Sequence, residues 1–113
     1  MKIVVTGSSG SLAEGIIALT LTATSHSLVL VDQRAPATRL SDPRVQYVTA
    51  DLRDYKTFLQ VLEGADGLIH LAAFPNPNLA HSSEIHNVNV SLSFNALTAA
   101  VEASVLKVVM ASS

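Results

Sequence analysis

The feature that most constrains this chain is a glycine-containing turn between an apolar segment and a helical one. Ile3, Val4 and Val5 form a continuous apolar run, which is typical of a strand buried on both faces of a parallel sheet. The sequence Thr-Gly-Ser-Ser-Gly-Ser-Leu-Ala follows at residues 6–13, where a helical spacing of apolar residues begins. A strand, a Gly-x-x-Gly-x-x-Ala turn and a helix in this order predict a phosphate-binding turn of the dinucleotide type.

The small residues of this turn each have a physical reason. Gly7 leaves the strand at a point where a side chain would block the turn, and Gly10 lets the backbone approach a pyrophosphate. Ala13 is small enough for the helix to lie close to the strand. The N-terminus of the helix offers free N–H groups and a partial positive charge to the phosphates. We therefore expect Gly7, Ser9 and Gly10 to contact a dinucleotide.

Strand and helix patterns alternate along the rest of the chain. The predicted strands cover residues 2–6, 28–31, 45–49, 68–72 and 106–111, and the predicted helices cover about 11–24, 55–63 and 83–104. The prolines in 33–44 and 74–78 predict loops, the first with at most one helical turn. The alternation predicts an α/β fold, a Rossmann-type doubly wound parallel sheet of five strands that binds ligands at the carboxyl ends of its strands. We expect residues 1–113 to be one such domain, truncated after the fifth strand.

Two aspartates follow predicted strands. Asp32 stands 19 residues after Ala13, where a carboxylate accepts hydrogen bonds from both adenosine ribose hydroxyls and repels a 2′-phosphate. This favours NAD over NADP, although Arg34 is a residue type that pairs with a phosphate. Asp51 is suited to accept from the adenine amino group while Leu52 packs on the ring. The alternatives are a solvated turn residue for Asp32 and a simple turn or cap for Asp51.

The long helix carries apolar residues on two sides. One stripe consists of Ile85, Val88, Leu92, Ala96, Ala99 and Ala103, and the other consists of Val90, Phe94, Leu97 and Val101. A surface helix needs only one such stripe. The second stripe therefore predicts either deep burial inside a larger domain or a subunit interface.

The composition excludes several classes of protein. A net charge of −2 predicts no nucleic-acid partner, and the absence of cysteine excludes disulfides and thiolate sites. No apolar run approaches the roughly 18 residues of a membrane span, so we expect a cytoplasmic protein with no membrane partner. His70 lies in an apolar strand and is interpreted as a core residue. His26, His81 and His86 show no metal-binding spacing, so no metal site is expected.

Together these residues resemble the extended short-chain dehydrogenase/reductase superfamily, in particular its NAD-dependent epimerase/dehydratase group. The matching positions span the whole chain: Thr6-Gly7-x-x-Gly10-x-x-Ala13, Asp32, Asp51-Leu52, His70-Leu71-Ala72-Ala73, Asn89-Val90 with Asn95, and Ala111-Ser112-Ser113. The resemblance implies that Ser11 and Leu12 line the pyrophosphate. It also implies that the adenosine ribose is surrounded by Asp32, Gln33 and Arg34. The lining towards the nicotinamide would consist of Leu71, Ala72, Ala73 and Phe74.

The resemblance also implies where catalysis would occur. Asn89 would lie near both the cofactor and the active site, and Ser113 would hydrogen-bond the reacting oxygen of the substrate. The helix at 83–104 matches the one that the family uses in dimer packing, which favours a homodimer. Leu92 and Ser93 stand where the family usually has Gly and Thr, which puts close packing there in doubt.

The family's catalytic Tyr-x-x-x-Lys pair is absent from these 113 residues. Tyr47 and Tyr55 are followed four positions later by Asp51 and Leu59 instead of lysine. One hypothesis is therefore the NAD-binding portion of an oxidoreductase that acts by hydride transfer on a sugar, a nucleotide-sugar or another hydroxyl substrate, inactive in isolation. The alternative is a non-catalytic dinucleotide-binding module or sensor. A purely structural domain is disfavoured by the joint placement of Asp32 and Asp51.

Overall fold

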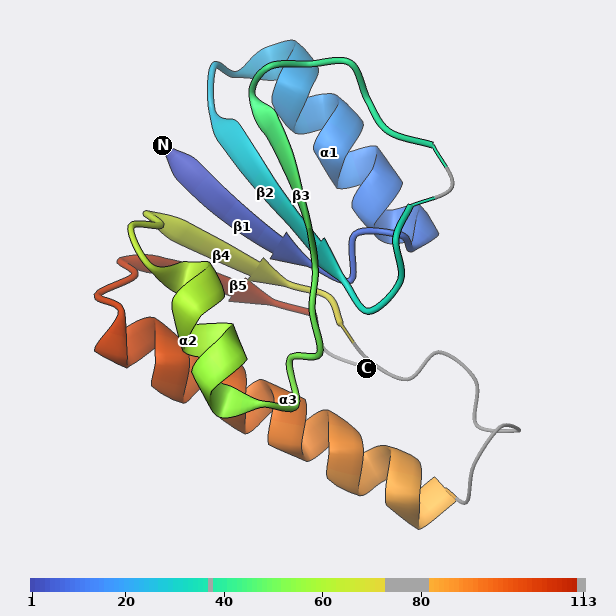
Figure 1. The fold of residues 1–113 in the computed structure, drawn as a ribbon, viewed down its shortest axis with the longest axis vertical. Helices are drawn as coiled ribbons and strands as arrows, with labels where there is room; N and C mark the ends of the chain where they lie inside the picture. The colour runs from blue at the N-terminus through green and yellow to red at the C-terminus, as the bar shows by residue number, and fades with distance from the viewer. Residues whose placement is uncertain (37, 73–81, 112–113) are drawn as a thin grey trace.

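A computed structural model of the chain describes residues 1–36, 38–72 and 82–111, without the side chains of 82–88. Its elements are β1 (Lys2–Thr6), α1 (Ser11–Ala23), β2 (Ser27–Asp32), β3 (Val45–Thr49), α2 (Tyr55–Leu62), β4 (Gly67–His70), α3 (Ser82–Glu102) and β5 (Lys107–Met110). The strands form one five-stranded sheet in the order β3-β2-β1-β4-β5, and all neighbouring pairs are parallel. The predicted doubly wound α/β architecture is confirmed (Figure 1).

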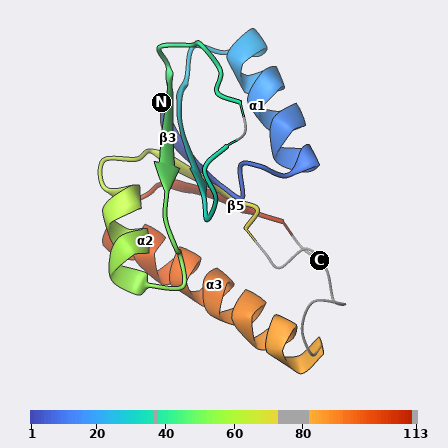
Figure 2. The same cartoon turned by 45° about the vertical axis from the view of Figure 1, so that its right-hand side comes forward.

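The helices cover the two faces of the sheet. α1 lies on one face, and α2 and α3 lie together on the other (Figures 1 and 2). Val5 points into the cluster under α1, with Ala13, Ile17, Leu28 and Leu30. Val4 points the other way, into the larger cluster that includes Phe58 and Leu92. The continuous apolar run of β1 follows from this arrangement, because successive side chains of a strand enter opposite cores.

β1 lies at the centre of the sheet, and its residue pairs show that the neighbouring strands end nearly level with it. Its last residue, Thr6, is paired with Val31 of β2 on one side and with His70 of β4 on the other. Asp32 is paired in turn with Thr49 at the end of β3. Because the strands are parallel, the segments that follow Thr6, Val31 and His70 leave the same edge of the sheet.

The helix ends show the expected local chemistry. Asp54 caps α2 by accepting a hydrogen bond from the Lys56 N–H (3.1 Å), a role that aspartate commonly has at the start of a helix. Gly64 follows with a φ of +74°, which suits a glycine just beyond a helix. α3 ends at Glu102 instead of 104, because Ser104 adopts a φ of +58° and the Val105 N–H turns back to the Ala100 carbonyl (2.9 Å).

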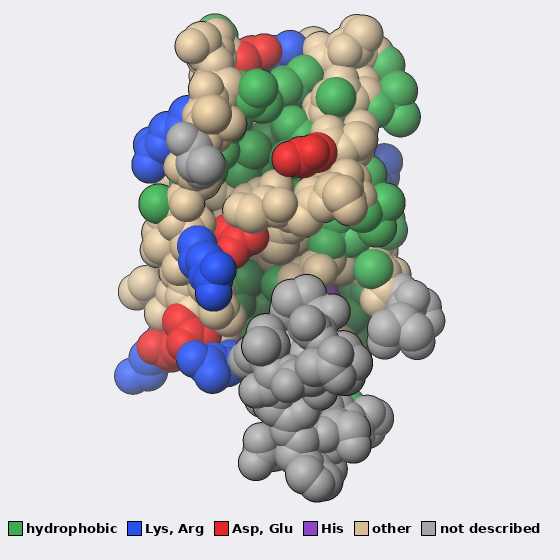
Figure 3. Space-filling model, turned by 90° about the vertical axis from the view of Figure 1, so that its right-hand side faces the viewer, with side chains coloured by type: hydrophobic (Ala, Val, Ile, Leu, Met, Phe, Trp, Pro, Cys, Tyr) green, Lys and Arg blue, Asp and Glu red, His purple; other side chains and the backbone are tan. Residues whose placement is uncertain are grey.

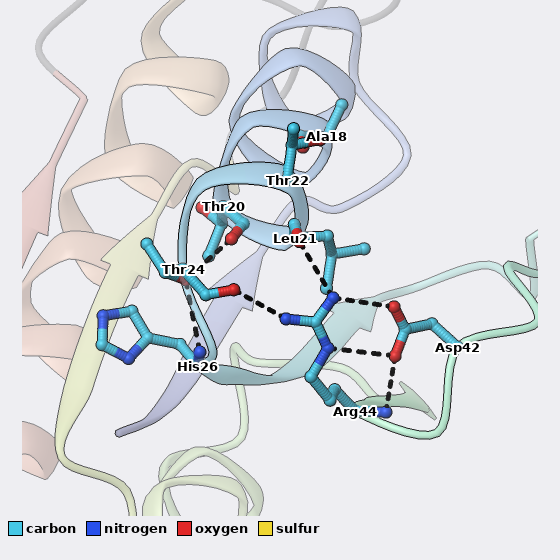
Figure 4. A network of polar contacts seen from close by, with 8 residues as sticks. All are labelled: Ala18, Thr20, Leu21, Thr22, Thr24, His26, Asp42 and Arg44. Carbon is cyan, nitrogen blue, oxygen red and sulfur yellow. Dashed lines mark hydrogen bonds and ion pairs between the residues drawn. The ribbon is translucent and has the colours of Figure 1, made fainter.

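The connection between β2 and β3 is anchored by one arginine. Arg44 donates to the Thr24 carbonyl (2.7 Å) and the Leu21 carbonyl (2.9 Å) at the end of α1, and it forms an ion pair with Asp42 (3.0 Å) (Figure 4). α1 has no basic residue in its last turn, so Arg44 brings a cation to its negative end from outside the helix. The side-chain hydrogen bond from Arg44 lowers the pKa of Asp42. Residues 33–36 and 38–44 form no helix; a hydrogen-bonded turn precedes β3, in which the Val45 N–H donates to the Asp42 carbonyl (3.1 Å).

α3 buries one apolar stripe and exposes the other. Leu92, Ala96 and Ala99 lie in the core. Phe94 and Val101 on the other side are 66% and 80% exposed, and Val90 and Leu97 are exposed as well. The second stripe is therefore not buried by any described part of this chain. Among the described helices, none is long and apolar enough to cross a membrane.

Candidate functional site

The segments that leave the carboxyl edge of the sheet bring the predicted cofactor residues together. The turn after β1, the loop after β2 and the segment after β4 all start there, at Gly7, Gln33 and Leu71. Figure 3 views this side, towards which the arrows of β1 and β4 point in Figure 1. Backbone and small uncharged side chains run across the middle of this surface, between hydrophobic side chains above and a group of acidic and basic side chains at lower left.

Gly7 lies where the turn after β1 touches the segment after β4. Its φ is +72°, and its N–H donates to the Val31 carbonyl (2.9 Å). A Cβ at this position would lie 2.8 Å from the Ala72 nitrogen and 2.9 Å from the Leu71 carbonyl carbon, which are both backbone atoms. The turn therefore needs glycine at this position both for its backbone conformation and for its close approach to the segment after β4.

The N-terminus of α1 is open to a ligand. Gly10 is its N-cap and supplies no side-chain hydrogen bond, so the first-turn N–H groups are available to a bound anion. A Cβ on Gly10 would meet only the Gly7 carbonyl oxygen, at 3.6 Å, so its small size leaves space for a ligand. Ser11 is exposed, and so is Leu12, with 62% of its surface accessible. Ala13 is buried against β1, which confirms the argument for a small residue there.

Asp32 joins the phosphate turn to the loop after β2. One carboxylate oxygen, Oδ2, accepts the Ser9 N–H (3.0 Å), and the other, Oδ1, accepts the Arg34 N–H (3.3 Å). Each oxygen retains a further lone pair, so both remain able to accept a hydroxyl hydrogen bond. The exposed Gln33 and Arg34 follow directly. The Asp32 carboxylate thus holds both the turn after β1, through the Ser9 N–H, and the loop after β2, through the Arg34 N–H.

Asp51 and Leu52 differ in accessibility. Asp51 is half-exposed and holds Arg53 in an ion pair (2.8 Å), and the hydrogen bond from Arg53 lowers the pKa of Asp51. Leu52 is only 4% exposed and belongs to the core, so its contact with an adenine ring, which stays a prediction, would use a small part of its surface. Asn95 of α3 donates to the Leu52 and Arg53 carbonyls (3.3 and 3.1 Å) and ties this loop to the helix.

A buried polar pair lies beneath the site. The hydroxyl oxygen of Thr6 and Nδ1 of His70 are 2.7 Å apart, and the Leu71 and Ala72 N–H groups donate to the same oxygen (3.1 and 3.2 Å). β4 ends at His70 and not at 72; the Leu71 N–H still reaches the Thr6 carbonyl oxygen (3.1 Å), whereas the Ala72 N–H donates to the hydroxyl. Burial lowers the pKa of His70, which is 3% exposed and packs near Phe58. The sequence placed His70 in the core but did not reveal its pairing with Thr6, 64 positions away.

The remaining predicted site residues are only partly placed. Asn89 lies on α3 and is half-buried. Ala73, Phe74 and Ser113 lie outside the described residues, as does His81. No group of three or more metal-ligating side chains occurs within the described ranges, so the expectation of no metal site stays a prediction.

Comparisons with known proteins agree with this geometry. The sequence profile of the NAD dependent epimerase/dehydratase family matches residues 3–113. A similar curated protein is the L-arabinose 1-dehydrogenase (NAD(P)(+)) of Haloferax volcanii, 32% identical over 111 residues. That alignment covers 98% of this chain but 40% of the dehydrogenase, so the chain spans less than half of its relative.

Two solved structures have the same fold over nearly the whole chain. A uronate dehydrogenase mutant from Agrobacterium tumefaciens complexed with NAD is 26% identical with a TM-score of 0.80, covering 99% of this chain and 40% of that one. The dTDP-glucose 4,6-dehydratase DesIV of Streptomyces venezuelae with NAD bound is 25% identical with a TM-score of 0.81, covering 96% and 38%.

Proposed function

The chain belongs to the NAD dependent epimerase/dehydratase family, and from this premise we propose that it forms the NAD-binding part of an oxidoreductase acting on a sugar or nucleotide-sugar hydroxyl. The observation that carries the proposal is the convergence of three elements at one edge of the sheet. These are the close approach of Gly7 to the segment after β4, the uncapped N-terminus of α1, and the Asp32 carboxylate bonded to the turn through the Ser9 N–H. A phosphate-binding turn and a ribose acceptor at this edge match the geometry of a bound dinucleotide.

The residues present fit NAD. The first-turn N–H groups of α1 would hold the pyrophosphate, since a helix N-terminus attracts anions. Asp32 would accept the two hydroxyl hydrogen bonds of the adenosine ribose, and Asp51 would accept from the adenine amino group. Leu71 and Ala72 would form the wall along which the nicotinamide end extends. When bound, NAD accepts a hydride from the substrate carbon.

The same geometry supports NAD over NADP. A 2′-phosphate would bring two negative charges close to the Asp32 carboxylate, which already serves the Ser9 and Arg34 N–H groups. The guanidinium of Arg34 would have to outweigh that repulsion. The Arg34 backbone N–H donates to the same Asp32 carboxylate. We therefore propose that the protein prefers NAD and binds NADP more weakly.

The substrate class is proposed from the relatives. Uronate dehydrogenase, L-arabinose dehydrogenase and dTDP-glucose dehydratase are named for sugars or a nucleotide-sugar. Asn89 and Ser113 are the residues of this chain that we propose to face the reacting carbon, with Ser113 donating to its oxygen. A Tyr-x-x-x-Lys pair does not occur in the 113 residues, so this chain would supply the cofactor site and not the proton-transfer pair. The second candidate is a dinucleotide-binding module without catalysis.

We also propose that α3 forms a homodimer contact. Its exposed stripe, Val90, Phe94, Leu97 and Val101, is an apolar surface that no described part of the chain covers. Such surfaces mark sites of protein association. A second copy of the same helix would cover the stripe across a two-fold axis.

Calorimetric titration of the full chain with NAD tests the cofactor proposal. Asp32→Asn should raise the Kd for NAD roughly tenfold to hundredfold, because hydrogen bonds to a charged group contribute about 1.5–3 kcal/mol. The matched control is Asp66→Asn, since Asp66 also accepts a backbone N–H, from Lys2 (2.8 Å), at the opposite edge of the sheet. Wild type with no measurable NAD binding, or equal effects of the two substitutions, would contradict the proposal. Hydride transfer from a sugar by the full protein would exclude the non-catalytic module.

A further inference from the structure

The hydroxyl oxygen of Thr6 lies within hydrogen-bond distance of two backbone N–H groups and a histidine ring nitrogen. The two N–H groups, from Leu71 and Ala72, point at this oxygen at 3.1 and 3.2 Å. Nδ1 of His70 lies at 2.7 Å. Both Thr6 and His70 are buried, so bulk water does not compete for these contacts.

The proton arrangement follows from counting donors and acceptors. A hydroxyl has one hydrogen to donate and two lone pairs to accept with. Backbone N–H groups only donate. The Ala72 N–H faces one lone pair of the hydroxyl oxygen, and the Leu71 N–H, which is shared with the Thr6 carbonyl oxygen (3.1 Å), faces the other. With N–H groups directed at both lone pairs, the hydroxyl hydrogen goes to Nδ1 of His70. Nδ1 is then the acceptor, and the ring proton of the neutral imidazole lies on Nε2, which is buried and has no hydrogen-bond partner among the described residues.

This network reaches the cofactor edge through Ala72. The Ala72 N–H that donates to Thr6 belongs to the same nitrogen that would lie 2.8 Å from a Cβ on Gly7. Gly7 follows Thr6 directly, so one hydroxyl sets how closely the phosphate turn and the segment after β4 approach each other. His70 fixes the direction of that hydroxyl by accepting its hydrogen.

We infer that Thr6 and His70, the latter in its Nε2-protonated form, are positioning residues that hold the phosphate turn and the Leu71–Ala72 wall in register for the dinucleotide. The inference rests on the proposed cofactor site. It gives a positioning role to two buried residues that do not touch the cofactor themselves. A neutral His70 ring agrees with the lowered pKa of this histidine, because burial disfavours the charged imidazolium.

The test compares substitutions at Thr6 by NAD titration of the full chain. Thr6→Val keeps the shape but removes the hydroxyl, and we expect the Kd for NAD to rise at least about tenfold. Thr6→Ser keeps the hydroxyl and should stay within about threefold of wild type. Val29→Ala is the control, because it opens a cavity in the core at β2 without touching the network. It should lower the urea midpoint and leave the Kd unchanged.

A second measurement does not depend on any variant or on NAD. Nitrogen-detected NMR of the His70 ring should show a bare Nδ1 and a protonated Nε2 at neutral pH. A protonated Nδ1 would overturn the inference, as would a wild-type Kd in Thr6→Val or an equal loss of affinity in Val29→Ala. If wild type binds no NAD, the proposed function fails, and the tautomer measurement still decides whether the network exists as described.

Discussion

Substituting Gly7 with alanine separates two reasons for a glycine at the phosphate turn. The first reason is the φ of +72°, which costs an L-residue roughly 1–2 kcal/mol. The second is the contact of a Cβ with the Ala72 nitrogen at 2.8 Å and the Leu71 carbonyl carbon at 2.9 Å. Forcing extra atoms into a packed site costs about 1–3 kcal/mol. We therefore expect Gly7→Ala to lower the free energy of unfolding by about 2–5 kcal/mol.

Two other glycines of the chain serve as matched controls. Gly64 has nearly the same φ, +74°, but a Cβ there would meet only the Lys2 Nζ, at 4.0 Å. Gly64→Ala should therefore cost only the roughly 1–2 kcal/mol of the left-handed backbone. Gly15 lies within α1 with nothing near its Cβ position, so Gly15→Ala should stabilise the protein by about 0.5–1 kcal/mol.

Urea unfolding of the full chain measures all three variants, and NAD titration accompanies it. Gly7→Ala should also lose NAD affinity, because Ala72 must move away from the turn, while the other two variants should bind as wild type does. A loss in Gly7→Ala no larger than in Gly64→Ala would refute the steric part of the reasoning. It would mean that Leu71 and Ala72 can move away from the added Cβ at little cost in free energy. The turn would then need glycine only for its positive φ.

Three further predictions concern the histidine, the α1 anchor and the exposed stripe. Burial lowers the pKa of His70, so as pH falls the unfolded chain, where histidine titrates near 6.5, binds the proton first. The stability that the neutral ring contributes is present above that value and is lost as pH falls through about 6.5 towards the lower pKa of the folded state, so the urea midpoint should drop on acidification, more steeply in wild type than in His70→Asn. Arg44→Lys should lower the urea midpoint because lysine cannot reach both helix carbonyls and the carboxylate, whereas Arg53→Lys, in an exposed pair, should not. Phe94→Glu should convert a dimer to a monomer in sedimentation experiments, and Thr22→Glu on α1 should leave the dimer intact; a monomeric wild type would contradict the α3 proposal.

The sheet and its cofactor edge could be predicted from the sequence because they depend on local patterns. The apolar run at β1 and the spacing from Gly7 to Ala13 each lie within a few residues, and they indicate a strand, a turn and a helix without any long-range information. The position of Asp32 followed from the end of a second apolar run. These features led to the correct α/β class and to residues that do meet at one edge.

What the sequence did not reveal depends on contacts between distant segments. The pairing of Thr6 with His70 joins β1 to β4, and no pattern within either strand signals it, although a polar residue at the end of each apolar run was a clue. Asn95 was matched by resemblance alone, and its two bonds to the loop after β3 need the packing of α3 on α2. Arg44 looked like one charged residue of a loop, and only the fold brings it to the end of α1.

The central place of β1 also bears on how the chain is made. β1 precedes the other four strands of the sheet in the chain, and it must pair on both sides, with β2 and with β4. β4 begins at Gly67, 40 residues after β2 begins at Ser27. At about 5–20 residues per second, one edge of β1 stays unpaired for roughly 2–8 s after the other can close. During that interval the side of β1 that later pairs with β4 is an open apolar strand edge, the kind of edge that favours aggregation.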